Sequence, residues 1–373
     1  MNLQPVASHL RACLMLTLAL AAASLASAAA DAPYFPPSDS RDWARTDPLA
    51  GGWNAVALDR VFAFAQAQGS TGLVIVQDGR LVAERYWSNV PDGHGASGGY
   101  AALQHGHTPQ GWPLEDVASI QKSVISVLVG IARAKGLVDV DRPVSSYLGT
   151  GWSRAPADKE ALITSRHLLG MASGLDSQFR YEAAPGTRWS YNTPVYGQLA
   201  LVLERASGQA LGAISEQWLT RPLGMSDSRW VARAGRLRAA NDNGFVTTPR
   251  DLARLGLSLL NGGTWAGRDV IGDPGWLEAS FSPSQPDYPG YGLLWWLNRG
   301  GYDAASGAAK KDFRGWFVPG APADMVAARG HYTRRLYVAP SLALVVVRLG
   351  PQAATRHFDQ AFWPLLMQAV PGR

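Results

Sequence analysis

Ser119 and Lys122 are the residues whose types and spacing best suit covalent catalysis. They open an apolar run that continues to Lys135 and stops at Gly136, a pattern typical of a buried helix that ends at glycine. Residues three positions apart share a helix face, so the serine hydroxyl and the lysine amine can meet in the first turn. Burial favours the neutral amine, which can accept the serine proton and turn the hydroxyl into a nucleophile.

The first turn of a helix also offers a place for negative charge. Its backbone N–H groups lack partners within the helix and can hold the oxyanion that forms when a serine attacks a carbonyl. The same pattern fits a second interpretation, in which Ser119 caps the helix and the Lys122 amine reaches solvent. A Ser-x-x-Lys match is weak evidence alone, because serine is common and the chain has five lysines.

The wider sequence resembles a family of serine hydrolases that comprises class C β-lactamases, D-Ala-D-Ala peptidases, esterases and 6-aminohexanoate-dimer-hydrolase-like amidases. The resemblance extends from Leu58 to Gly350, which is most of the chain. The matching blocks, in chain order, are residues 118–123, 129–132, 168–175, 185–191, 248–254 and 345–350. Several blocks in order are more specific than one short motif, and the resemblance implies that Ser119 is the nucleophile and Lys122 its base.

The second motif of that family is Tyr-x-Asn, and the resemblance assigns its tyrosine to Tyr191, with an acid/base role beside Lys122. A neighbouring cation favours the phenolate, which allows a tyrosine to shuttle protons. The chain departs from the family pattern after this tyrosine, because it reads Tyr191-Asn192-Thr193. Asn192 and Thr193 are therefore alternative candidates for the substrate contact that the family's asparagine makes.

The third motif of the family, Lys-Thr-Gly or His-x-Gly on a strand, corresponds to the stretch from Gly330 to Arg334. The resemblance makes His331 a pocket residue and the backbone N–H of Arg334 the second oxyanion donor. Thr333 stands where glycine is usual, which predicts a narrower or shifted passage along the strand edge. Histidine in place of lysine removes a permanent cation for a substrate carboxylate, although Arg329 and Arg334 are near in sequence.

Strands are expected near both ends of the chain. Residues from Gly72 to Trp87 alternate around Asp78-Gly79, a strong hairpin signal. Two further β-rich runs, 335–338 and 342–348, precede an amphipathic helix over about residues 355–370, and the middle of the chain has mostly helical patterns. The expected fold is α/β and β-lactamase/transpeptidase-like: an antiparallel sheet built from both ends and flanked by helices, with a mostly helical domain inserted.

This arrangement predicts the domain organisation. Residues 1–28 are expected to be a signal peptide and residues 29–56 an extended leader. Residues 57–118 and 285–373 would form the α/β sheet domain, and residues 119–284 the mostly helical domain. The active site is expected at the interface of the two domains.

The N-terminal segment indicates export. One basic residue, Arg11, precedes an apolar run from Ala12 to Leu25 and a small-residue Ala26-Ser27-Ala28 cleavage pattern. A membrane anchor is the competing interpretation, but the run is short for one. We therefore expect a periplasmic or secreted protein without a stable membrane anchor. Cys13 is the only cysteine and would be removed, which excludes disulfides and a cysteine nucleophile in the mature chain.

Composition excludes several other classes. Apolar residues make up 47% of the 373 residues and charged residues 17%, as in globular proteins. The net charge of +5 is spread along the chain without a long basic run, so no nucleic-acid partner is expected. His94, His105 and His107 lie in a glycine-rich segment without nearby carboxylates, so no metal is expected, and the chemistry needs no other cofactor.

These observations predict an exported serine hydrolase that acts through an acyl-enzyme on an ester or amide bond of a small-molecule or peptide-like substrate. Esterase or linear amidase activity is the leading hypothesis, because the second and third motifs depart from the family pattern at Thr193 and Thr333 and lack the usual lysine. A β-lactamase or D-Ala-D-Ala carboxypeptidase is the alternative. A catalytically silent cell-wall-binding protein is the second alternative, and the sequence leaves the oligomeric state open.

Overall fold

The computed structural model describes residues 33–88, 98–233, 242–303, 308–310 and 317–372. The expected signal peptide lies outside these residues. The chain divides into two units, residues 1–34 and 35–373, and the helices and strands described here belong to the second. No helix among the described residues has the length and apolar character needed to span a bilayer.

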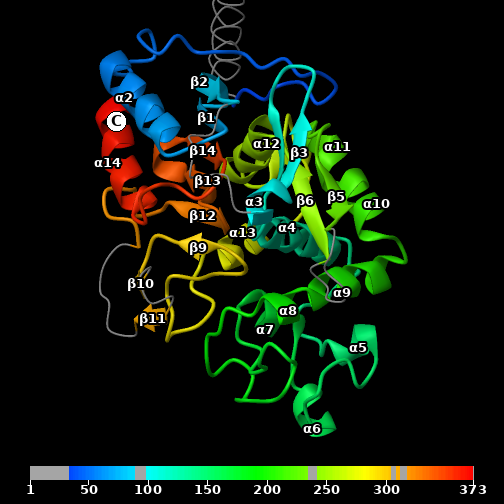
Figure 1. The fold of residues 1–373 in the computed structure, drawn as a ribbon. Coiled ribbons are helices and arrows are strands. Elements are labelled where there is room, and N and C mark those ends of the chain that lie inside the picture. The colour runs from blue at the N-terminus through cyan, green and yellow to red at the C-terminus, as the bar shows by residue number, and fades with distance from the viewer. Residues whose placement is uncertain (1–32, 89–97, 234–241, 304–307, 311–316, 373) are drawn as a thin grey trace, which may run out of the picture. The chain divides into compact units, whose positions relative to one another are not determined.

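The main sheet of the second unit has six antiparallel strands drawn from both ends of the sequence (Figure 1). In spatial order they are β2 (Arg80–Tyr86), β1 (Gly72–Gln77), β14 (Leu344–Leu349), β13 (Arg334–Ala339), β12 (Val326–Gly330) and β9 (Trp296–Leu297). The expected hairpin is confirmed, because β1 and β2 pair across Asp78 and Gly79, which both have positive φ. The expected union of the two ends is also confirmed, since Gly72 pairs with Leu349.

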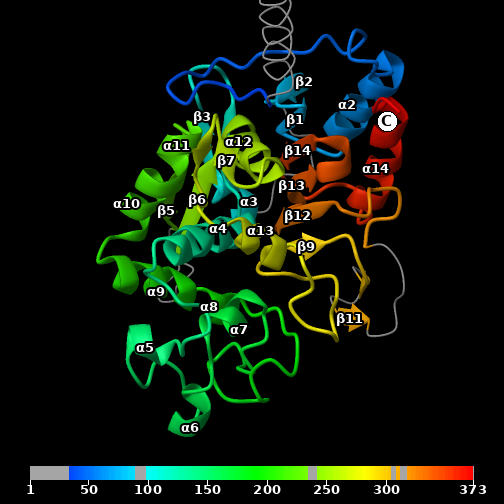
Figure 2. The same cartoon turned by 180° about the vertical axis from the view of Figure 1, so that it is seen from behind.

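Helices cover this sheet on both faces (Figures 1 and 2). On one side α2 (Ala55–Ala67) packs against α14 (Phe358–Ala369). On the other side α12 (Pro249–Leu260) contacts β1, β13 and β14, and α4 (Ile120–Ala134) contacts β12 and β13. Gly256 allows α12 this close approach, because a Cβ there would stand 2.5 Å from the Val345 side chain.

A second antiparallel sheet has the order β3 (Gln104–His107), β4 (Pro113–Asp116), β6 (Asn243–Thr247) and β5 (Arg229–Ala232). The sequence predicted mostly helical structure through this middle region, and the structure adds β5 and β6 to it. The strand β6 pairs with β4 from more than a hundred residues earlier, and β5 pairs with β6. The domain boundaries themselves stay a prediction.

Short elements complete the described part of the chain. The remaining helices are α3 (Gly98–Ala101), α5 (Ser145–Leu148), α6 (Ala157–Glu160), α7 (Ser165–Leu169), α8 (Thr193–Tyr196), α9 (Gln198–Ser207), α10 (Leu211–Ser215), α11 (Arg221–Leu223), α13 (Pro274–Ser280), the π-helical turn η1 (Glu216–Thr220) and the 3₁₀ turn η2 (Pro340–Leu342). Two small hairpins pair β7 (Thr264–Trp265) with β8 (Arg268–Asp269) and β10 (Gly301–Asp303) with β11 (Ala308–Lys310).

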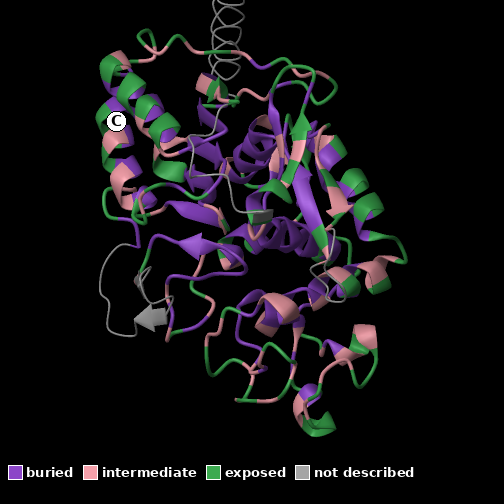
Figure 3. Cartoon of the chain, viewed as in Figure 1, coloured by how far each residue is buried: buried purple, intermediate pink, exposed green. Residues whose placement is uncertain are grey.

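The interior centres on the main sheet and α4. Every residue of β1, β13 and β14 is buried, and α4 is buried without interruption from Ile120 to Ala132 (Figure 3). The elements α5, α6 and α10 present exposed residues on their outer sides. A helix that is apolar on nearly every face has to be enclosed, and this explains why α4 forms the centre of the molecule rather than its surface.

Candidate functional site

A tight strand-to-helix turn presents Ser119. The strand β4 ends at Asp116, and α4 begins at Ile120, with Ser119 in the N-cap position. Ala118 between them has a φ of 52°, in the left-handed region that costs an alanine about 1 kcal/mol or more. The Asp116 carboxylate accepts a 2.8 Å hydrogen bond from the Ala118 N–H and so holds the turn. The serine therefore sits at the first turn of a rigid, buried helix.

Lys122 contacts this serine directly. Its Nζ lies 2.9 Å from the Ser119 Oγ, within hydrogen-bond distance. The lysine is 2% exposed, and the burial of its amine, with a smaller contribution from the Arg233 charge, lowers its pKa from 10.5 to about 7. The competing interpretation of a solvent-reaching amine is wrong, because the amine points into the protein beside the hydroxyl. A neutral amine at this position can act as a base near neutral pH.

Two aromatic rings enclose the Lys122 amine. The ring centroid of Tyr191 lies 5.0 Å from Nζ and that of Tyr196 lies 4.4 Å away. Tyr191 is 37% exposed and stacks on Trp296 at 5.8 Å between centroids. Tyr196 is buried and its hydroxyl accepts a hydrogen bond from Gln121. The structure therefore brings Tyr191 to the pair that the sequence predicted it would join.

Two cavities meet at Ser119. The first, about 440 Å³, is lined by Ser119, Lys122, Thr193, Arg233 and His331, among others. The second, about 640 Å³, is lined by residues that include Ser119, Tyr191, His331 and Thr333. Six of the eight predicted site residues thus line cavities that share the candidate nucleophile. The other two, Asn192 and Arg334, line neither of them.

Asn192 has a structural role that the motif comparison did not reveal. Its side-chain oxygen accepts a 3.2 Å hydrogen bond from the Val195 N–H and caps α8, while its amide donates to the Leu175 carbonyl at 2.9 Å. The residue is 7% exposed. Between the two alternatives for the substrate contact, Thr193 is the one that lines the cavity.

The third-motif stretch lies in a turn just before β13, next to the strand that the sequence predicted over residues 335–338. His331, Tyr332 and Thr333 connect β12 to β13, and the left-handed conformations of Tyr332 and Thr333, both with φ of 60°, reverse the chain. The Thr333 hydroxyl accepts hydrogen bonds from the Gln352 amide at 2.8 Å and from the Ala353 N–H at 3.2 Å. Its side chain is therefore directed to the C-terminal loop.

The Arg334 side chain is withdrawn from the site. It is fully buried and pairs with the Glu115 carboxylate, with Nε–Oε2 at 3.0 Å. Its backbone belongs to β13 and pairs with Gly330 of β12. Gly330 in turn packs against the carbonyl of Val117, two residues before Ser119, where a Cβ on residue 330 would leave no room. The role of the Arg334 N–H as the second oxyanion donor stays a prediction.

Arginines give the second cavity a positive lining. Arg329, Arg335 and Arg356 line it, and Arg329 and Arg335 both donate to Asp359. Although burial opposes ionisation of Asp359, the charges of Arg335 and Arg329 lower the pKa of this carboxyl well below its usual range. The sequence pointed to Arg329 but missed Arg335 and Arg356, because no local pattern distinguishes them from the many other arginines of the chain.

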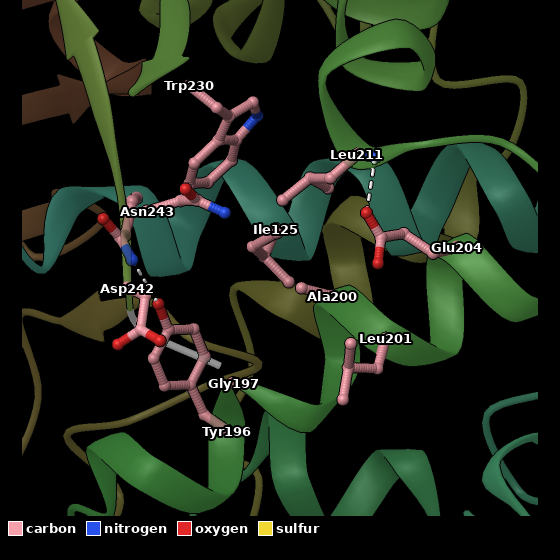
Figure 4. A pocket seen from close by; sticks show the side chains of 11 residues that line it. Ile125, Tyr196, Gly197, Ala200, Leu201, Glu204, Leu211, Trp230, Asp242 and Asn243 are labelled. Atoms are coloured by element: carbon pink, nitrogen blue, oxygen red, sulfur yellow. Dashed lines mark hydrogen bonds between the residues drawn. The ribbon is translucent and has the colours of Figure 1, made fainter. Parts of the chain in front are cut away.

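A third cavity of about 390 Å³ has Gln121 and Tyr196 in its lining, and Figure 4 shows Tyr196 there. Ile125, Leu211 and Trp230 give it an apolar wall, and the Glu204 carboxylate at its rim accepts the Leu211 N–H at 2.8 Å. Neither Ser119 nor Lys122 lines it.

Among the described residues, no group of three or more His, Cys, Asp and Glu side chains could hold a metal ion. Of the three histidines that the sequence analysis considered, His94 lies outside the described residues.

Comparison with known proteins agrees with this architecture. The Beta-lactamase family model matches residues 58–361. Esterase EstB of Burkholderia gladioli is 29% identical over 31% of this chain and 38% of its own length. The D-alanyl-D-alanine-carboxypeptidase/endopeptidase AmpH of Escherichia coli is 25% identical over 65% of this chain and 67% of its own. A Bacillus anthracis structure, provisionally designated a 6-aminohexanoate-dimer hydrolase, superposes with a TM-score of 0.64 at 14% identity, over 90% of this chain and 89% of that one.

Proposed function

This chain belongs to the Beta-lactamase family of serine hydrolases, and we propose that it cleaves ester or linear amide bonds through an acyl-enzyme on Ser119. The observation that carries the proposal is the 2.9 Å contact between the Ser119 Oγ and a buried lysine amine. Burial lowers the pKa of that amine to about 7, so it is largely neutral in mildly alkaline solution. Hydroxyl and base are thus preorganised on one helix turn.

The proposed reaction has two displacements. Ser119 Oγ attacks the substrate carbonyl while its proton passes to Lys122 Nζ, and backbone N–H groups at the start of α4 stabilise the oxyanion. The proton then moves to the leaving alcohol or amine, with Tyr191 as the shuttle, and the carbon–heteroatom bond breaks. Water, deprotonated by the same pair, attacks the acyl-enzyme and releases the acid.

The substrate class follows from the groups around Ser119. The absence of lysine from the turn at His331 and the aromatic surface of Tyr191 and Trp296 favour neutral esters and linear amides. The names of the relatives, which include an esterase and an amidase-type hydrolase, agree with this class. We also propose that the protein is exported, on the N-terminal pattern of the sequence.

A second candidate function has an observation of its own. The cavity that contains Ser119 and Tyr191 is also lined by Arg329, Arg335 and Arg356. Arg329 and Arg335 both donate to the Asp359 carboxylate, and the lining carries three guanidinium groups. Such a lining attracts a substrate carboxylate. This favours D-Ala-D-Ala carboxypeptidase activity as the alternative, in agreement with the name of the relative AmpH.

A fluorophosphonate probe tests the central claim without knowledge of the substrate. The purified protein is treated with the probe, and mass spectrometry locates the modified peptide; labelling at Ser119 is expected. Ser119→Ala should abolish it, whereas the matched control Ser123→Ala should not, because the Ser123 hydroxyl donates to the Leu294 carbonyl, away from the cavities. A protein that stays unlabelled at Ser119 would be a silent binder.

Substrate profiling then separates the two enzymatic candidates. The panel consists of short-chain p-nitrophenyl esters, short linear amides, nitrocefin and D-Ala-D-Ala peptides. The leading proposal expects the highest kcat/KM with a neutral ester or amide. A higher kcat/KM with nitrocefin or a D-Ala-D-Ala peptide than with every neutral substrate would reverse the order of the two candidates.

A further inference from the structure

A buried ion pair lies beside the proposed base. Asp116, at the end of β4, is 1% exposed. Arg233 follows β5 and donates two hydrogen bonds to this carboxylate, from Nε to Oδ2 at 2.6 Å and from Nη2 to Oδ1 at 2.9 Å. The same Nη2 donates to the Gln121 Oε1 at 2.8 Å. Three bonds to fixed partners hold the planar guanidinium in one orientation.

This guanidinium faces the catalytic cavity. Arg233 lines the same cavity as Ser119 and Lys122, and its side chain is 15% exposed. Its partner Gln121 neighbours Lys122 on α4 and donates to the Tyr196 hydroxyl at 2.7 Å, so one network runs from Asp116 to the ring over the Lys122 amine.

The groups around Lys122 Nζ include no carboxylate in contact with it among the described residues. Ser119 faces it from its own helix, Tyr191 and Tyr196 from α8 and the residues before it, and His331 from the turn after β12. These groups are hydroxyls, phenol rings and an imidazole, and none of them is a carboxylate. Of the ion pair formed by Asp116 on β4 and Arg233 after β5, Arg233 acts on Lys122: burial first and then the Arg233 charge lower the pKa of Lys122.

The two charges have opposite effects on the base. An uncompensated buried carboxylate favours the ammonium form of a lysine in its surroundings, and an ammonium cannot accept the Ser119 proton. Arg233 neutralises Asp116 through two hydrogen bonds and also places its own positive charge at the cavity wall. If Arg233 were absent, the positive charge that disfavours the ammonium form of Lys122 would be lost, and the uncompensated Asp116 would favour cationic forms of titratable groups around it, His105 on β3 included.

We propose that Arg233 is a positioning residue for the base: by pairing with Asp116 at the wall of the cavity, it keeps Lys122 uncharged and ready to accept the Ser119 proton. This inference rests on the proposed function of Ser119 and Lys122. It assigns to Arg233 an electrostatic role in the acylation step, without direct contact to the reacting atoms.

The test measures the rate constant of Ser119 labelling by a neutral fluorophosphonate as a function of pH. For the wild-type protein the rate should rise with pH around a midpoint near 7, where Lys122 loses its proton. In Arg233→Met the midpoint should move upward by roughly 1 to 3 pH units, because the positive charge that disfavours the ammonium is gone and Asp116 is left uncompensated. A merely structural role of Arg233 would lower the rate at every pH and leave the midpoint in place.

Three further variants make the sign of the effect decisive. Arg233→Lys keeps a cation beside Asp116 and should keep the midpoint near the wild-type value. The double variant Asp116→Asn/Arg233→Met removes both charges and should bring the midpoint back down from that of Arg233→Met. Asp116→Asn alone leaves the positive charge of Arg233 unbalanced and should move the midpoint below that of the wild type. This variant tests the proposal even if Arg233→Met does not fold.

A matched control removes an arginine with similar bonding elsewhere. Arg166 donates to Asp141 from Nε at 2.5 Å and from Nη2 at 2.7 Å, and it does not line the cavity. Arg166→Met should leave the midpoint unchanged. Labelling of Ser119 with the same midpoint in the wild type, Arg233→Met and Asp116→Asn would overturn the inference. Absence of Ser119 labelling in the wild type would instead overturn the proposed function.

Discussion

The substitution Lys122→Arg tests whether the lysine acts as a base or only as a fixed positive charge. Arginine keeps the charge and a similar length, but its guanidinium does not release a proton in proteins. Because Lys122 Nζ contacts the Ser119 Oγ at 2.9 Å, a group at this position that cannot deprotonate cannot accept the serine proton. We therefore expect Lys122→Arg to lose activity, as Lys122→Met should.

The magnitude follows from the pKa of the amine. At a pKa of about 7, roughly nine tenths of the lysine amines are neutral at pH 8. An amine with the ordinary value of 10.5 would be neutral in only roughly 0.3% of molecules, so burial and the Arg233 charge together increase the population of the active base roughly 300-fold. Removal of a general base typically costs about 10²- to 10⁴-fold, and we expect a loss of kcat/KM in this range for both variants.

The assay is hydrolysis of a p-nitrophenyl ester by the wild type and both variants across a pH series, with circular dichroism to check folding. The wild-type kcat/KM should fall as the pH is lowered through about 7, because Lys122 becomes protonated. Both variants should lack this titration. Near-full activity of a folded Lys122→Arg protein would refute the assignment of Lys122 as the base and leave it a role as a cation only.

Three further predictions concern neighbouring groups. Tyr191→Phe keeps the ring stacked on Trp296 but removes the hydroxyl. The kcat for a neutral ester should therefore fall by about 10²-fold, while the midpoint of thermal unfolding stays the same. An unchanged kcat would assign proton transfer to Lys122 alone. His331→Lys adds a permanent cation at the cavity. Because nitrocefin bears a carboxylate, its kcat/KM should rise by up to about fivefold relative to that of a neutral ester. An equal gain for both substrates would show that the gain is not electrostatic. Arg334→Met leaves the buried Glu115 without its cation, so the free energy of unfolding, measured by a urea titration, should fall by about 3 to 5 kcal/mol. A loss below about 1 kcal/mol would show that the hydrogen bonds from the Thr71 and Tyr100 hydroxyls are enough to stabilise this carboxylate.

The sequence by itself determined the features that depend on neighbouring residues. The hairpin at Asp78-Gly79 follows from two turn residues between alternating strands. The buried helix α4 follows from an unbroken apolar run that ends near Gly136, and the contact of Ser119 with Lys122 follows from their three-residue spacing on that helix. Such features rest on backbone geometry over one or two turns, so local patterns are enough to predict them.

Only the tertiary structure decided which distant residues surround this pair. Arg233 reaches Asp116 across 117 positions of the chain, and no short pattern marks either residue as a partner of the other. The sequence placed Asn192 among the substrate contacts, but its side chain caps α8 through Val195 and its amide donates to the Leu175 carbonyl, a partner 17 positions earlier that only the fold brings close. The turn from His331 to Thr333 likewise depends on how β12 and β13 pair. Long-range contacts of this kind are selected by the packing of whole elements, which residue types and spacing along the chain do not encode locally.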